Sequence, residues 1–347
     1  MGMEAWRIWD NKVKPQLSLG RLEYLAVEIV EMLGSLHPAI TRPKLLLFAA
    51  DHGIVAEGVS SSPQEITWQQ CVNFAQGGGA IGLICNANNI DLEVIDVGVA
   101  HKFEPGIPIV DRKIAWGTQN FLSHAAMSGE QLYKVLKVGV DLVEDSVARG
   151  YRIFAFGEMG IGNTTSASAL MAALTSFEVT QCCGRGAGLD DRGVAHKCKV
   201  IGDALQFHGK LTDPLEILRT YGGFEIAAIT GGMLGAASRR AVILVDGFIA
   251  SMAAAFAIAI EPLAQQYMVF CHESGEGGHP LLLKYLGVEP LLSLKMRLGE
   301  GTGAAVAWPI IRQSLDLYLN MNSFSSAKVT DSVAMLKQQG VDLHEYE

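Results

Sequence analysis

One carboxylate near the C-terminal end of the chain stands in a stretch that could hold a proton acceptor. Glu300 lies among Gly299, Gly301 and Gly303, and a run of small residues, 304–307, follows. Glycines permit tight turns and close approach of a ligand. A helix that starts after them would point free N–H groups at whatever binds. A sequestered Glu here suits general base catalysis, whereas a solvated Glu on a surface turn fits the same local pattern.

A second glycine-rich stretch, residues 157–165, follows a short apolar run and contains another carboxylate, Glu158. Its backbone N–H groups could bind a phosphate, because a helical pattern follows. It lacks the Gly-Lys-Ser/Thr ending of a Walker loop and the glycine spacing of a dinucleotide site. The phosphate of a mononucleotide is the simplest remaining ligand, and a connection that binds nothing is the alternative. If Glu158 or Glu300 is shielded from water, its pKa rises and it can act as a base near neutral pH.

Metal and thiol chemistry are less well supported. Cys271, His272 and His279 match no tetrahedral zinc spacing. The chain has six cysteines and no C-x-x-C pair, which is typical of reduced thiols in a cytosolic protein. Cys182 and Cys183 are adjacent, and Arg185 is the one basic residue close to them in the sequence. Since basic neighbours are what activate a thiol, we interpret both cysteines as unreactive.

Several short apolar runs alternate with helical patterns and would position these groups. Each suits a buried strand, and most lead into Gly, Asp, Glu or Asn: residues 44–50, 92–99, 151–156, 241–245 and 267–271. The alternation predicts an α/β fold with a doubly wound, mostly parallel sheet covered by helices on both faces. Ligands bind at the carboxyl edge of such sheets. We therefore expect one composite site from loops near 51–70, 157–165, 184–197, 246, 272–279 and 297–303.

Composition excludes some partners. The 347 residues carry a net charge of −9 with no basic block, which disfavours nucleic acid. The longest apolar run, residues 248–260, is shorter than the ~20 residues of a membrane span. The first residues do not have the pattern of a signal peptide. We expect a cytoplasmic protein with small-molecule substrates.

Several motifs together resemble one family, the nicotinate-nucleotide:dimethylbenzimidazole phosphoribosyltransferases of cobalamin synthesis, often called CobT. They occur in family order over nearly the whole chain: 14–15 with 18–23, 50–53 with 57–59, 94–98, 157–165, 222–225, 233–237, 244–248 and 296–305. The family transfers the phosphoribosyl group of nicotinate mononucleotide to 5,6-dimethylbenzimidazole, giving α-ribazole 5′-phosphate and nicotinate. The resemblance implies no metal or organic cofactor, a cytoplasmic location and a homodimer.

The resemblance also implies roles for single residues. Glu300 would be the general base that removes the benzimidazole proton, and Glu158 a second carboxylate near the reacting centre. Three residues fall where the family contacts the nucleotide phosphate: Gly160, Lys197 and Ser274. Three fall where it lines the base pocket: Ser62, Gln70 and Met159.

The implied architecture is a large α/β domain, residues 38–308, which carries the active site. A small helical domain would be built from both chain ends, 1–37 and 309–347, where Leu22, Leu25, Ile29 and Leu33 recur at helical spacing. The chain also departs from the family pattern. Gln16 and Leu17 replace a usual Pro-Gly pair, and Gly188 stands where Asn is common.

Three other functions fit part of the pattern. A related transferase could attach another lower-ligand base, such as a purine or a phenolic compound. A nucleotide-binding sensor on the same fold would bind the nucleotide but release no nicotinate. A nicotinamide dehydrogenase is disfavoured because the dinucleotide glycine spacing is absent.

Overall fold

The computed structural model describes residues 1–341, and they form two compact units. The first, here called the terminal unit, combines Met1–Thr41 with the chain from Trp308 onward. The second, here called the sheet unit, is Arg42–Ala307. The residues predicted to form the site all belong to the sheet unit.

The sheet unit is built on a six-stranded sheet in the order β3-β2-β1-β4-β5-β6, in which every pairing is parallel. This confirms the predicted fold class. The order reverses between β1 and β4, so the carboxyl ends of those strands flank the crevice where doubly wound sheets bind ligands. The strands are β1 (Lys44–Ala50), β2 (Asp91–Gly98), β3 (Ile109–Asp111), β4 (Ile153–Met159), β5 (Val242–Val245) and β6 (Met268–Phe270).

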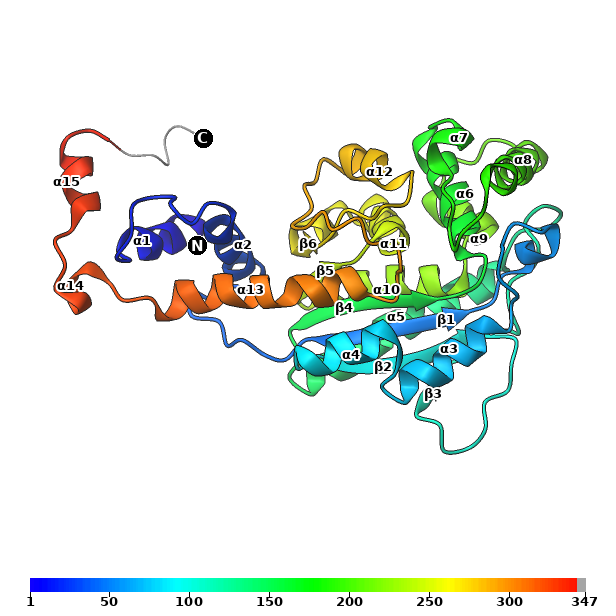
Figure 1. The fold of residues 1–347 in the computed structure, drawn as a ribbon, viewed down its shortest axis with the longest axis horizontal. Coiled ribbons are helices and arrows are strands. Elements are labelled where there is room, and N and C mark those ends of the chain that lie inside the picture. Colours follow the sequence, from blue (N-terminus) through cyan, green and yellow to red (C-terminus); the bar gives the residue numbers. More distant parts are fainter. Residues whose placement is uncertain (342–347) are drawn as a thin grey trace. The chain divides into compact units, whose positions relative to one another are not determined.

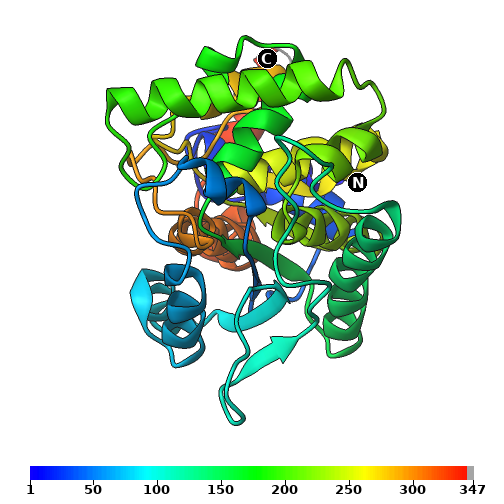
Figure 2. The same cartoon turned by 90° about the vertical axis from the view of Figure 1, so that its right-hand side faces the viewer.

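Helices cover both faces of this sheet (Figure 1). Figure 2 shows α3 and α4 on one side of the sheet and α5 on the other. Along the unit the helices are α3 (Ile66–Ala75), α4 (Gly79–Ala87), α5 (Gly129–Ala148), α6 (Asn163–Thr175), α7 (Val179–Cys182), α8 (Asp191–His208), α9 (Pro214–Tyr221), α10 (Phe224–Ser238), α11 (Phe248–Ile260) and α12 (His279–Leu286). Two 3₁₀ turns, η1 (Gly53–Glu57) and η2 (Pro262–Tyr267), complete it.

Small residues let α10 lie between the sheet and α5. A Cβ added at Gly139 of α5 would stand 2.0 Å from the Ala228 carbonyl oxygen of α10. A Cβ added at Gly231 of α10 would stand 2.0 Å from the Leu136 carbonyl oxygen of α5. Glycine at these positions therefore allows the two backbones to touch. Nearly all of α10 is buried, which gives the sheet a firm support behind its site.

The terminal unit is helical. It contains α1 (Gly2–Asp10), α2 (Arg21–Leu33), α14 (Phe324–Ala327) and α15 (Ser332–Gln338), and α13 (Thr302–Asn320) crosses the boundary between units. Its interior holds the edge-to-face rings of Trp9 and Tyr318, with centroids 5.5 Å apart. Lys14 and Glu23 form a buried ion pair at 2.6 Å. Trp9 donates its indole N–H to the Glu23 carbonyl oxygen.

Two searches of the described residues gave negative results. No helix between residues 1 and 341 has both the length and the apolar character needed to cross a membrane. Within the same residues, no three His, Cys, Asp or Glu side chains are grouped to hold a metal ion. The six cysteines are all free thiols, and five of them are buried.

Candidate active site

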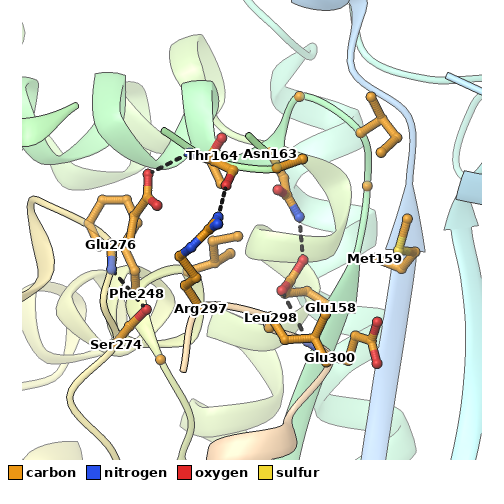
Figure 3. Close-up of a pocket in the computed structure, with 18 of the residues that line it drawn as sticks. Glu158, Met159, Asn163, Thr164, Phe248, Ser274, Glu276, Arg297, Leu298 and Glu300 are labelled. Atoms are coloured by element: carbon orange, nitrogen blue, oxygen red, sulfur yellow. Dashed lines mark hydrogen bonds between the residues drawn. The ribbon is translucent and has the colours of Figure 1, made fainter. Parts of the chain in front are cut away.

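The carboxyl ends of the central strands open into a cavity of about 510 Å³. Each of the six loops expected from the sequence contributes lining residues, so segments far apart in the chain meet at one place. Figure 3 shows Glu158, Met159 and Glu300 on one side of this cavity and Phe248, Ser274 and Glu276 on the other. Glu158 and Glu300 therefore face a wall that carries an apolar ring, a hydroxyl and a third carboxylate.

Glu300 sits on a turn with an unusual backbone. Gly299, Glu300 and Gly301 all have left-handed φ angles, at 80°, 65° and 85°. That conformation is ordinary for glycine but strained for glutamate. The turn also lies directly on β4, since a Cβ added at Gly157 would stand 2.4 Å from the Glu300 carbonyl oxygen. The glycines flagged in the sequence thus serve both the turn and its close approach to the sheet.

The Glu300 carboxyl is buried beside the cavity and has a raised pKa. Its side chain is 8% exposed and lines the cavity. Burial raises its pKa to about 7, the backbone N–H of Ile81 opposes that rise, and the charge of Asp246 adds to it. Among the described residues, Oε2 has no hydrogen-bond partner. A carboxylate oxygen that is buried and unpartnered beside a cavity is available to accept a proton from a ligand.

Glu158 lies at the end of β4, beside Glu300. Its Oε1 accepts a hydrogen bond from the Glu300 backbone N–H at 3.3 Å, and its Oε2 accepts one from the Asn163 side-chain amide. Burial, followed by the charges of Glu225 and Asp246, raises its pKa well above the usual range. Glu158 therefore binds a proton more tightly than an exposed Glu does, and it ties the Glu300 turn to the sheet.

The opposite wall carries Ser274, one of the three residues expected to contact phosphate. Ser274 lines the cavity and is held from both sides: its backbone N–H donates to His279 Nδ1 at 2.8 Å, and its hydroxyl accepts from Glu276 N–H at 3.2 Å. Burial lowers the pKa of His279 to about 3, so this ring stays neutral. Gly160 lines the cavity in the turn before α6.

Lys197 has a different position from the other predicted residues. It is fully buried in α8 and is not one of the described residues that line the cavity. Its Nζ donates to the Thr164 hydroxyl at 2.9 Å and to the Gly184 carbonyl at 3.4 Å. Thr164 does line the cavity, so Lys197 stands directly behind that wall. Burial lowers the pKa of Lys197, and the charge of Glu276 partly offsets this.

The residues expected at the base pocket also line the cavity: Ser62, Gln70 and Met159. Ser62 is in a loop after η1 that is closed by hydrogen bonds of 3.1 Å between Ser60 and Ser62. Gln70 lies on α3, and its side-chain oxygen accepts from Asn73 at 3.0 Å. The structure thus brings seven of the eight predicted site residues to one cavity and places Lys197 behind it.

Several lining residues had no role assigned from the sequence: Asn163, Thr164, Asp246, Glu276 and Arg297. Glu276 accepts a hydrogen bond from Gly186 N–H at 3.1 Å, and Arg297 donates to the Gly186 carbonyl at 2.9 Å. These contacts shape the glycine-rich loop beside the cavity. For Asp246, the available signal was its position directly after a strand, which it shares with Asp51.

Comparisons with known proteins agree on one family. A phosphoribosyltransferase family model matches residues 1–329. The chain is 46% identical to the nicotinate-nucleotide–dimethylbenzimidazole phosphoribosyltransferase of Ralstonia nicotianae over 93% of this chain and 92% of that protein. It is 44% identical to the enzyme of that name from a Janthinobacterium species over 94% of both.

A solved structure agrees as well. The crystal structure of CobT from Thermus thermophilus superposes with a TM-score of 0.91 at 36% identity, covering 95% of this chain and 98% of that one. The resemblance found in the sequence motifs is thereby confirmed. The chain belongs to the nicotinate-nucleotide–dimethylbenzimidazole phosphoribosyltransferase family.

Proposed function

We propose that this enzyme transfers the phosphoribosyl group of nicotinate mononucleotide to 5,6-dimethylbenzimidazole, with Glu300 as general base. The products are α-ribazole 5′-phosphate and nicotinate. The relatives' names support the reaction. The observation that carries the role of Glu300 is its buried, unpartnered Oε2 on the cavity wall. A pKa of about 7 makes this carboxylate a stronger base than an exposed Glu while leaving it substantially ionised near neutral pH.

The proposed chemistry requires one proton acceptor and no general acid. One benzimidazole nitrogen attacks the anomeric carbon from the face opposite the nicotinate, which inverts the configuration from β to α. The bond to nicotinate breaks and its electron pair returns to the pyridine nitrogen, which neutralises the ring. The other benzimidazole nitrogen loses its proton to Glu300 Oε2. Since the anomeric carbon becomes oxocarbenium-like, a nearby negative charge stabilises it.

Glu158 is proposed to act at that carbon. Burial and the neighbouring charges of Glu225 and Asp246 raise its pKa, which favours the protonated form in the free protein. A cationic nicotinate ring beside it would favour the ionised form. An ionised Glu158 would then stabilise positive charge that develops on the ribose while its Oε1 holds the Glu300 backbone N–H.

The nucleotide phosphate is proposed to bind at the opposite wall. Ser274 lines that wall and Gly160 lines the cavity in the turn before α6, and both can donate hydrogen bonds to phosphate oxygens. Lys197 lies just behind Thr164 and contributes a positive charge. Ser62, Gln70 and Met159 are proposed to contact the benzimidazole. The family resemblance supports two further proposals, a homodimer and a cytoplasmic location, which size-exclusion chromatography and cell fractionation would test.

Glu300→Gln tests the base directly. The amide keeps the side-chain volume but cannot accept the benzimidazole proton, so we expect turnover to fall by about 10²–10⁴-fold. Binding of nicotinate mononucleotide should change little, because the phosphate and ribose contacts remain. Nicotinate release and α-ribazole 5′-phosphate are measured by chromatography, and nucleotide binding by calorimetry. Turnover within a factor of two of the parent would remove Glu300 from this role.

A further inference from the structure

Asp246 stands at the carboxyl end of β5 and collects the backbone N–H groups that follow Glu300. Its Oδ2 accepts from Gly301 at 3.1 Å. Its Oδ1 accepts from Gly303 at 2.6 Å and from Ala304 at 3.2 Å. The side chain is 5% exposed. Gly303 and Ala304 lie in the first turn of α13 and Gly301 directly precedes it, and unpaired N–H groups at a helix start favour a negative partner.

Those same hydrogen bonds hold a strained turn. Glu300 keeps a φ of 65° between two glycines that are also left-handed. A non-glycine residue stays in that conformation only where its surroundings determine it. Asp246 fixes the chain immediately after Glu300, and Glu158 holds the Glu300 N–H at 3.3 Å. Two carboxylates from neighbouring strands thus clamp the turn that carries the third.

We propose that Asp246 is a positioning residue for the transfer: its carboxylate fixes the turn of Glu300, and its negative charge acts on the Glu300 carboxylate. The inference rests on the proposed role of Glu300 as the base. The sequence placed residue 246 among the loops of the site but assigned no role to its side chain. Its contacts to Gly301, Gly303 and Ala304 define its role independently of any substrate.

The charge acts in a defined surrounding. Burial is the largest cause of the raised pKa of Glu300, the Ile81 N–H of α4 lowers it, and Asp246 raises it. Glu158 faces the turn from β4 and has a raised pKa of its own. His272, at the end of β6, is buried, and burial lowers its pKa, so it is neutral near pH 7. Burial raises the pKa of Asp246 itself to about 6, so Asp246 is mostly ionised where Glu300 titrates, and removing its charge should lower the pKa of Glu300.

Asp246→Asn separates the two effects from general damage. The amide oxygen can still accept the hydrogen bonds from the Gly303 and Ala304 N–H groups. The amide nitrogen would instead face the Gly301 N–H, and because both groups are donors that hydrogen bond would be lost. We expect kcat to fall by about 10–100-fold, since small displacements of reacting groups have effects of that size. The KM for nicotinate mononucleotide should stay within about threefold. The matched control is Asp213→Asn, which alters an exposed helix cap outside the cavity and should leave kcat unchanged.

The dependence of kcat/KM on pH distinguishes the proposed charge effect from a purely structural role, which would leave this dependence unchanged. A base works only when deprotonated, so kcat/KM in the parent should fall as pH drops through about 7. In Asp246→Asn this acid limb should move to lower pH by at least about half a unit, because a like charge has been removed. An unmoved limb, or parent-level kcat, would overturn the proposal. If Asp246→Asn does not fold, Asp246→Glu decides: it keeps the charge and shifts the carboxylate, so parent-level kcat contradicts positioning.

Infrared titration of the Glu300 carboxyl, identified by its loss in Glu300→Gln, needs no turnover. A lower titration midpoint in Asp246→Asn supports the proposed charge effect even if no nicotinate is released, and an equal midpoint contradicts it. If the parent protein releases no nicotinate with dimethylbenzimidazole, the proposed function fails. The two hypotheses are therefore tested separately.

Discussion

Glu300 combines two features that oppose folding. Its backbone is left-handed, which for a non-glycine residue costs about 1–3 kcal/mol. Its carboxyl has a pKa of about 7, raised from 4.5 mainly by burial. Because the folded protein binds this proton more tightly than the unfolded chain, the stabilising contribution is complete below pH 4.5 and is lost as pH rises through about 7. The ionised base is thus formed at a cost to stability, as is common at active sites.

Leu17, in the terminal unit, has a similarly strained backbone. Its φ is 55°, a left-handed conformation that glycine adopts without strain. We predict that Leu17→Gly stabilises the protein by about 1 kcal/mol, because relief of roughly 1–3 kcal/mol of backbone strain exceeds the added flexibility of the unfolded chain. The free energy of unfolding in urea measures this.

Leu19→Gly is the matched control for that substitution. Leu19 is similarly half-buried but does not have a left-handed φ. Glycine there relieves no strain and adds conformational entropy to the unfolded chain, so it can only destabilise the fold. We expect Leu19→Gly to lower the free energy of unfolding. Equal destabilisation by both variants would show that the conformation of Leu17 is not strained.

At the scale of elements, the strand β4 and the turn of Glu300 must touch for the site to form. Gly157 of β4 has no room for a side chain, since a Cβ would stand 2.4 Å from the Glu300 carbonyl oxygen. We predict that Gly157→Ala displaces the turn and lowers kcat by about 10²-fold. Steady-state nicotinate release measures kcat, and circular dichroism checks that the sheet survives.

Gly202→Ala is the control for adding a methyl group elsewhere. Gly202 lies inside α8, and nothing approaches its added Cβ within 4 Å. Alanine is the better helix former, so this variant should gain roughly 0.5–1 kcal/mol of stability and keep the parent kcat. Parent-level kcat in Gly157→Ala would mean that the turn does not need its close approach to β4.

The elements themselves were largely predictable from the sequence. Lys44–Ala50 is a continuous apolar run and forms the buried strand β1, and the runs near 151–156 and 241–245 also became strands. β3 was missed because it has only three residues and lies at the sheet edge. Its residues are half-buried or exposed, so they do not form the continuous apolar run that marks the central strands. Once the strands are parallel, their carboxyl ends must meet, so the loops of the site could be predicted together.

Side-chain direction was harder to predict. The sequence offers no signal that Lys197 points behind Thr164 rather than into the cavity, because several residues of α8 could face inward. The role of Asp246 depends on β5 lying next to β4 and on α13 starting close to both, which are long-range contacts. The local sequence indicates what chemistry a side chain can perform. Which residues it contacts is decided by the order and packing of the strands, which the local sequence does not reveal.

At the scale of the whole molecule, both chain ends contribute to one unit that is separate from the sheet. Its interior contains a buried ion pair between Lys14 and Glu23, in which the two side chains are 5% and 1% exposed. Glu23 also accepts the Leu19 N–H at 2.9 Å. Removing one partner of such a pair leaves an uncompensated charge, whose burial typically costs about 3–5 kcal/mol.

We therefore predict that Glu23→Ala lowers the free energy of unfolding by about 3–5 kcal/mol, whereas Lys14→Met/Glu23→Leu together costs much less, because no charge is left buried. A chain of two units can unfold in more than one step, so calorimetry should place the loss in the step that includes the terminal unit. Tryptophan fluorescence follows that step through Trp9, which donates to the Glu23 carbonyl. A loss below about 1 kcal/mol for Glu23→Ala would show that the pair does not hold this unit together.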